Sequence, residues 1–159
     1  MISLIISLFL DGLLSVYEKV LHIRPMFSIV ILSILFIRNY NNISFYYKIC
    51  LFAGFIYDLL YTSTFPLNSL VFLLLGFIIS KLYQIFKNNL LTGVLINIFI
   101  LLIYRSITFI VLSIIGYLPF SFNLFIDDIL SIVLTNTVFF LFVYIIFKDH
   151  KRKITKYGL

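Results

Sequence analysis

Long apolar runs, separated by only a few polar residues, occupy almost the whole 159-residue chain. Hydrophobic residues make up 63% of the sequence and charged residues 11%, and the mean hydropathy is +1.18. A soluble domain of this size is about half apolar and about a quarter charged, so a water-soluble enzyme or a free nucleic-acid-binding protein is ruled out. A helix needs about 20 residues to span a hydrocarbon core of about 30 Å. The length therefore allows five or six membrane helices in one domain.

The polar breaks between these runs divide the chain into helices. We predict an all-α polytopic membrane protein with one transmembrane domain over residues 1–147 and about six spans. The basic segment 148–159 is expected to be a cytoplasmic tail, too short and too polar to fold alone. Residues 25–38 form the weakest span because their apolar core is short, so a five-span alternative remains open. The expected spans cover residues 2–17, 25–38, 43–61, 67–86, 90–117 and 125–147.

Lys and Arg residues indicate the orientation, because they gather on the cytoplasmic side of membrane proteins. With six spans and a cytoplasmic N-terminus, nine basic residues lie inside, Lys19 and Arg24 lie outside, and Arg105 lies within the membrane. With five spans, eleven basic residues lie inside and none outside. Both arrangements place the tail in the cytoplasm. The nine inner residues are Arg38, Lys48, Lys81, Lys87, Lys148, Lys151, Arg152, Lys153 and Lys156.

A reporter fused to the N-terminus distinguishes the two arrangements. An even number of spans returns the chain to the side on which it started, so six spans place the N-terminus in the cytoplasm with the tail. We expect a fusion to alkaline phosphatase, which is active only after export, to be inactive there. The same fusion at the C-terminus is the control and should be inactive in both arrangements. An active N-terminal fusion would contradict six spans.

Several charged residues fall within the expected spans or at their ends, where ionisable groups are costly and usually face the protein interior. Arg105 lies about 22 Å along its span, at a depth similar to that of the acidic residues in the six-span arrangement. We expect it to pair inside the bundle with Asp58 or with one of Asp127 and Asp128. Removing one partner of such a pair should be costly. The charged residues within the expected spans or at their ends that we single out here are Asp11, Asp58, Arg105, Asp127 and Asp128.

A second interpretation of Asp127 and Asp128 places them in interfacial water as the N-terminal cap of the last helix. General capping preferences favour this interpretation over the ion pair. For Asp58 we favour a buried structural role.

The sequence contains no motif typical of catalysis, and we expect no enzyme activity, no cofactor and no metal site. A Tyr-Asp dipeptide within a span, here Tyr57-Asp58, also occurs in intramembrane aspartyl proteases. Those enzymes need a second catalytic Asp in a Gly-x-Gly-Asp motif, which this sequence lacks. A zinc motif His-Glu-x-x-His, a Gly-x-Ser-x-Gly elbow and a phosphate-binding glycine loop are absent as well. His22 and His150 lie near no ligand set, and the lone Cys50 excludes an intrachain disulfide.

Small and amide side chains within the spans indicate how the helices pack. Asn68, Asn97 and Asn136 are expected to form hydrogen bonds across helices. Small residues four positions apart permit two helices to approach closely. These pairs are Ser3/Ser7, Gly76/Ser80 and Ser131/Thr135.

The stretch GFIYDLLYTS at residues 54–63 resembles the signature of the MreD family of rod-shape-determining membrane proteins. In that family a Gly-Phe, here Gly54 and Phe55, and then an Asp, here Asp58, precede a polar turn and another apolar helix. The family often has a further glycine upstream, which is missing here. It usually has glycine in the turn, where Pro66 stands in this chain.

Other parts of the chain resemble the same family. Arg24-Pro25 before the second span and Thr135-Asn136 in the last span are similar to family features, as are the length and the order of spans. The resemblance implies a non-enzymatic scaffold of the cell-wall elongation machinery, which serves peptidoglycan biogenesis and cell shape. It also implies an MreC-like bitopic partner, other elongation proteins as partners, and a location in the bacterial cell membrane. The implied fold resembles the substrate-binding subunits of energy-coupling-factor transporters.

A vitamin- or metal-binding transporter subunit of that architecture is the alternative. Such subunits commonly carry an Ala-x-x-x-Ala motif in the first helix, whereas the first run here contains no alanine. Ser3 and Ser7 could substitute for the two alanines sterically. The short extracytoplasmic loops also leave few polar or aromatic groups to bind a substrate.

Overall fold

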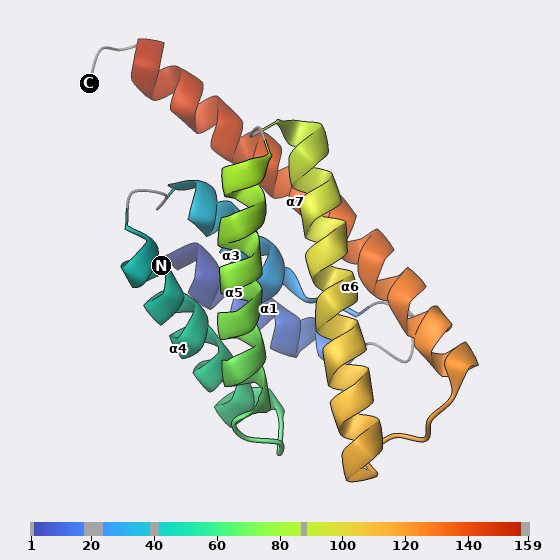
Figure 1. Ribbon diagram of the computed structural model, residues 1–159. Helices are drawn as coiled ribbons and strands as arrows, with labels where there is room; N and C mark the ends of the chain where they lie inside the picture. Colours follow the sequence, from blue (N-terminus) through green and yellow to red (C-terminus); the bar gives the residue numbers. More distant parts are fainter. Residues whose placement is uncertain (1, 18–23, 39–41, 87–88, 157–159) are drawn as a thin grey trace.

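The computed structural model is all-helical over the residues that it describes, which are 2–17, 24–38, 42–86 and 89–156. Figure 1 shows the connections after α4 and after α6 at one end of the bundle, and the C-terminus of α7 at the other end. The order of elements follows the predicted order of apolar runs. The helices are α1 (Ile2–Ser15), α3 (Phe27–Arg38), α4 (Ile43–Tyr61), α5 (Leu67–Ile85), α6 (Leu90–Ile115) and α7 (Phe122–Lys156).

Helix length separates these elements into two groups. Four helices are long and apolar enough to cross a membrane: α4, α5, α6 and the part of α7 from Phe125 to Ile146. The helices α1 and α3 have 14 and 12 residues, which correspond to about 21 and 18 Å. Both are shorter than a hydrocarbon core of about 30 Å. The prediction of a polytopic helical membrane protein is confirmed, with four helices of full span length and two shorter apolar ones among the described residues.

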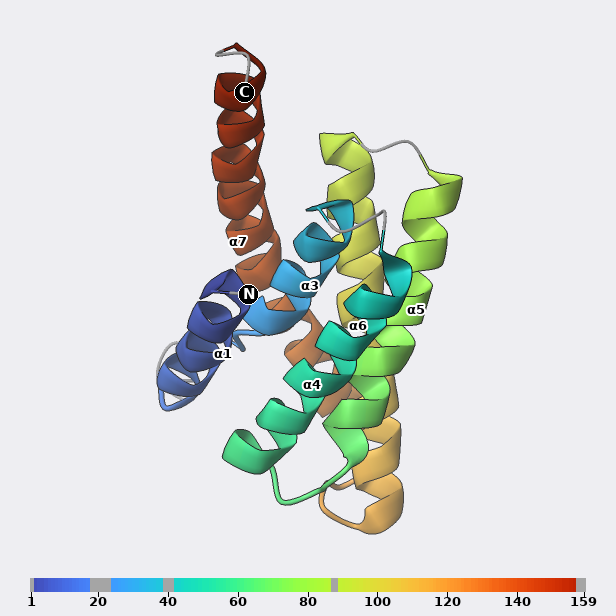
Figure 2. The same cartoon turned by 90° about the vertical axis from the view of Figure 1, so that its left-hand side faces the viewer.

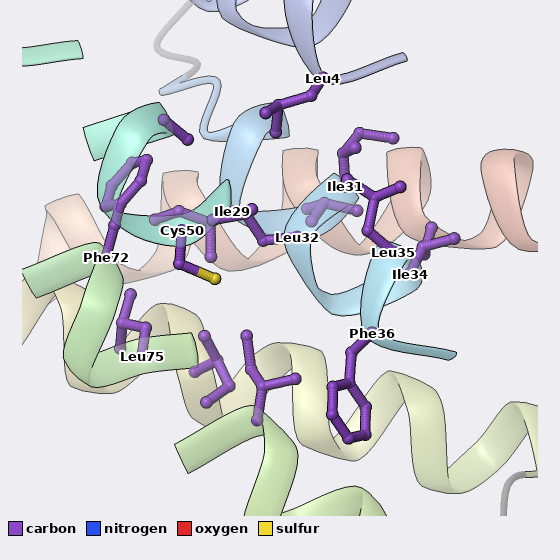
Figure 3. Close-up of a cluster of buried hydrophobic side chains, with 14 of the residues drawn as sticks. Leu4, Ile29, Ile31, Leu32, Ile34, Leu35, Phe36, Cys50, Phe72 and Leu75 are labelled. Atoms are coloured by element: carbon purple, nitrogen blue, oxygen red, sulfur yellow. The ribbon is translucent and has the colours of Figure 1, made fainter. Parts of the chain in front are cut away.

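The short helix α3 lies at the centre of the bundle. It contacts α1, α4, α5, α6 and α7, and Figure 2 shows it between α1 and the long helices. Every residue from Phe27 to Phe36 is buried. A helix that is apolar on all sides is stable when protein surrounds it, which explains how this run can be both apolar and short. Figure 3 shows side chains from four helices in this core: Leu4, Ile29, Leu32, Phe36, Cys50, Phe72 and Leu75.

The helices α4 and α5 pack closely because small residues lie between them. A Cβ atom added at Gly54 would lie 2.6 Å from the Cα atom of Ser69. A Cβ atom added at Gly76 would lie 2.6 Å from the Sγ atom of Cys50 on α4. The Oγ atom of Ser80 lies 2.8 Å from the hydroxyl of Tyr47 on α4. The predicted small pair Gly76/Ser80 therefore lies in the contact between these helices.

Gly116 ends α6 in the left-handed conformation, with φ of 86°. Its N–H donates to the carbonyl oxygen of Ser113 at 3.2 Å, and the N–H of Tyr117 donates to that of Leu112 at 2.9 Å. Glycine is preferred at this position because it has no Cβ atom to clash with the backbone. Pro119 then prevents the helix from continuing.

The last helix is longer than the sequence prediction. It begins at Phe122 rather than at residue 125, and it continues to Lys156, into the basic segment 148–159. Residues 122–156 contain neither Gly nor Pro, so nothing interrupts the helix where the apolar span ends.

Replacing Gly54 by Ala tests the close approach of α4 and α5. The added methyl group meets the backbone of α5, so Gly54→Ala is expected to lower the free energy of unfolding by about 1–3 kcal/mol. Thermal unfolding of the purified protein in detergent measures the change. Gly12→Ala is the control, because its methyl group would meet the ring of Tyr61, which is 37% exposed and can turn away with the loss of its one hydrogen bond to Leu8; we expect a smaller loss there. Equal effects of the two changes would contradict a backbone clash at Gly54.

Candidate functional site

The carboxylate of Asp58, near the end of α4, caps the N-terminus of α5. Its Oδ1 accepts from the N–H of Asn68 at 3.0 Å, and its Oδ2 accepts from the N–H of Ser69 at 2.8 Å. The side chains of the same two residues donate to it at 2.9 and 2.8 Å. Asp58 is 1% exposed. A carboxylate in this place is stabilised by the free N–H groups and the dipole of the helix.

Asn68 links this carboxylate to α6. The hydroxyl of Tyr104 donates to Oδ1 of Asn68 at 2.9 Å. On the other side, the Thr62 hydroxyl donates to Oδ1 of Asp58 at 3.0 Å. Tyr104 and Asn68 are both buried, so their polar atoms need partners within the protein. The hydrogen bonds of this group therefore connect α4, α5 and α6.

Asp11 of α1 has the same role at the N-terminus of α3. Its Oδ1 accepts from the N–H of Phe27 at 2.6 Å, and its Oδ2 accepts from the N–H of Ser28 at 2.9 Å. Asp11 is 2% exposed. The Tyr61 hydroxyl, at the end of α4, donates to the carbonyl oxygen of Leu8 at 2.8 Å. These bonds fix α1 to both α3 and α4.

Asp128 of α7 forms ion pairs with Arg24 and with Arg105. The side chains of Arg105 and Asp128 are 11% and 14% exposed, and that of Arg24 is 31% exposed. The two pairs join α6, α7 and the segment that precedes α3. Among the three partners that the sequence left open for Arg105, the structure selects Asp128. Asp58 instead binds the N-terminus of α5.

Asn136 of α7 holds the segment before α3 in a second place. Its Oδ1 accepts from the N–H of Met26 at 2.8 Å, and its Nδ2 donates to the carbonyl oxygen of Arg24 at 3.0 Å. Asn136 is fully buried. The expectation of hydrogen bonds across helices is confirmed for Asn68, which bonds to α4 and α6. Asn136 bonds instead to the segment before α3 and to Ile132 of its own helix.

We call these groups together the polar network. Its side chains come from α1, α4, α5, α6, α7 and the segment before α3, and α3 takes part through the N–H groups of Phe27 and Ser28. Tyr104 and Arg105 are consecutive on α6, and Met26 directly precedes the first residue of α3, so the separate parts are joined along the chain. Two carboxylates face helix N-termini, each of which carries roughly half a positive charge, and the third faces two guanidinium groups. Negative and positive charges are thus roughly balanced. The polar network consists of Asp11, Arg24, Asp58, Asn68, Tyr104, Arg105, Asp128 and Asn136.

Asp127 lies outside the polar network, on an exposed part of α7. The interpretation of Asp127 and Asp128 as the cap of the last helix is wrong, because α7 begins at Phe122 and has no acidic residue in its first turn. The earlier start places both residues in the second turn, where Asp128 turns inward and Asp127 outward.

The remaining predicted site residues have packing roles or lie apart. Gly54 separates α4 from α5, as described above. Phe55 is 40% exposed, and its ring packs edge-on against that of Phe65, with 5.8 Å between the centroids. Thr135 is half-buried on α7, and within the described part of the chain its side chain has no part in the polar network.

Asn97 differs from the other two asparagines. It is fully buried, and neither its Oδ1 nor its Nδ2 has a hydrogen-bond partner among the described residues. The prediction of a bond across helices is wrong at this position. Ile96, Ile100 and Leu101, which surround it on the buried face of α6, are apolar.

The chemistry that the polar network supports is structural. The carboxylates of Asp11 and Asp58 accept from N–H groups, and that of Asp128 pairs with two guanidinium groups. Over the ranges that the structure describes, no three His, Cys, Asp or Glu side chains come together as a metal site. The observed contacts hold helices in a fixed register.

Sequence reasoning missed the partner of Arg24 and the role of Asp11. One sequence feature could have indicated the role of Asp11. The helix that starts at Met26-Phe27 has no capping side chain directly before it, so its first N–H groups need an acceptor from another part of the chain. Arg24 was counted only as a loop residue and a family feature. Its pairing depends on how α7 lies against α3, which no local pattern contains.

The apolar spans and the buried polar network define a polytopic membrane protein whose charged groups hold its helices together. The family of rod shape-determining protein MreD matches residues 1–149, so the chain belongs to the MreD family. This is a family of membrane proteins that determine cell shape, and it is not known as a family of enzymes. No curated protein and no solved structure matches the chain. The likeness to energy-coupling-factor subunits therefore stays a prediction.

Asp128→Asn tests the ion pairs of the polar network. The change removes the negative charge that both guanidinium groups face, so we expect a loss of about 3 kcal/mol in the free energy of unfolding, the low end of the range for buried pairs. Thermal unfolding in detergent measures this loss. Asp127→Asn removes the same charge from the neighbouring exposed position and should change stability by less than about 0.5 kcal/mol. Similar losses of stability in both variants would contradict a stabilising role for the ion pairs of Asp128 with Arg24 and Arg105.

Proposed function

We propose that the protein is a non-enzymatic scaffold of the cell-wall elongation machinery in the bacterial cytoplasmic membrane. The family match over residues 1–149 is the observation that carries this proposal. The partner is a bitopic protein of the MreC type, through which the scaffold reaches other proteins that build the wall of rod-shaped cells.

The polar network supports a scaffold rather than a substrate-handling protein. Its carboxylates are held by helix N-termini and by arginines, and such contacts fix the relative positions of helices. The outer surface carries many large apolar side chains, such as Phe9, Phe99 and Phe142. In a membrane this surface can pack against lipid and against the helices of other membrane proteins.

The basic residues support a cytoplasmic C-terminus. Lys48 lies near the start of α4 and Lys81 near the end of α5, at the same end of the bundle as the basic segment of α7 (Figure 1). Basic residues gather on the cytoplasmic side of membranes. This end of the bundle therefore faces the cytoplasm in our proposal, and the connections after α4 and α6 face the opposite side.

Depletion of the protein followed by microscopy tests the scaffold. We expect rod-shaped cells to become round and swollen, because wall elongation loses its membrane scaffold. Expression of the unchanged chain should restore the shape, and so should Asp127→Asn. Asp128→Asn should restore it poorly, in proportion to its lower amount in the membrane on a blot.

A nutrient requirement with normal cell shape would overturn the proposal and favour a transporter subunit. Purification in mild detergent separates the two functions in a second way. Co-purification of an MreC-type protein supports the scaffold. Co-purification of a pair of ATPases with a large membrane coupling subunit supports transport.

A further inference from the structure

An apolar groove lies on the surface of the α4–α5 pair. It has a volume of about 340 Å³ and is lined by Tyr47, Leu70, Leu73, Leu74 and Phe77. This volume lies in the range of clefts that hold small molecules, about 300–1,000 Å³. Leu70, Leu74 and Phe77 are each between 45% and 59% exposed, so the groove opens toward the surroundings of the bundle.

The groove is cationic at one end. The hydroxyls of Tyr47 and Ser80 lie 2.8 Å apart and join α4 to α5 at this level. Lys48 and Lys81 directly follow these two residues, and both are exposed. The ammonium group of Lys81 lies 5.7 Å from the centroid of the Phe77 ring, which lines the groove.

The two lysines lie toward the same end of the α4–α5 pair. Lys48 is five residues after the start of α4, and Lys81 is four residues before the end of α5. These helix ends lie on the same side of the bundle as the C-terminal part of α7 (Figure 1). Lysine side chains near the ends of membrane helices extend to the level of the lipid headgroups.

The shape of the groove suits a hydrocarbon chain. Its lining extends from Leu70 to Phe77, about 10 Å along α5. The side chains that line it are apolar apart from Tyr47, so an extended hydrocarbon chain can lie along the helix in it.

We propose that this groove binds one acyl chain of an anionic phospholipid, whose phosphate lies at Lys48 and Lys81. The apolar lining receives the chain, and the two ammonium groups match the negative charge of the headgroup. Net negative charge distinguishes this ligand from a zwitterionic lipid with the same chains. The site uses no residue of the polar network, so it is independent of the scaffold function.

Lipid retention by the purified full-length protein tests the proposal. Native mass spectrometry in detergent measures how much phosphatidylglycerol and phosphatidylcholine, with identical acyl chains, stay bound. We expect the unchanged protein to retain about ten times more phosphatidylglycerol, and the double variant Lys48→Gln/Lys81→Gln to lose this preference. The control Lys151→Gln/Lys153→Gln removes the same charge from the basic end of α7 and should keep the preference. Equal loss in both double variants would overturn the site, because it would show general attraction to basic residues.

A second pair of variants tests the groove itself. Leu74→Trp fills the groove and leaves both lysines in place, so it should lower retention of phosphatidylglycerol about as much as the lysine variant. Leu134→Trp, at a 68% exposed position of α7, is the matched control and should have no effect. Unchanged retention in Leu74→Trp would overturn the proposal. Displacement of the lipid by soluble glycerol 3-phosphate would also overturn it, because the phosphate alone would then account for binding.

Discussion

Two helix N-termini that lie inside the protein, those of α3 and α5, determine much of the remaining structure. Hydrocarbon offers no hydrogen-bond partner, and each unsatisfied backbone group there costs several kcal/mol. Asp11 and Asp58 supply carboxylates to these N–H groups. Because these carboxylates belong to α1 and α4, α1 must lie beside the start of α3, and α4 must end beside the start of α5. The positions of four helices are thus linked by two side chains.

The buried ends also explain why a membrane protein of this size contains two helices shorter than a span. α3 begins within the bundle, where Asp11 and Asn136 bind its first residues, and it is surrounded by protein over its length. A helix in this position need not reach both membrane surfaces. Its apolar sequence serves the core, in the manner of a buried helix of a soluble protein.

Much of the fold could be predicted from the sequence, because apolar runs and Pro residues mark helices directly. Asp58 stood out as a charge within a span, and Gly54 as part of the stretch that resembles the family signature. The partner of Arg105 could not be chosen among three carboxylates, because the choice depends on the register of α7 against α6. Local rules misled at Asp127-Asp128, where a capping pattern falls in the second turn of a helix that starts earlier. At Asn97 a general rule about buried amides failed.

The unbroken helix α7 gives the bundle a mechanical property. From Asp128 to Lys156 it extends for about 42 Å without a glycine or proline that could act as a hinge. The carboxylate that both arginines share sits near one end of this stiff rod, and the basic residues sit at the other. Because the helix is continuous, a tilt at its basic end would also move the carboxylate of Asp128 that pairs with Arg24 and Arg105.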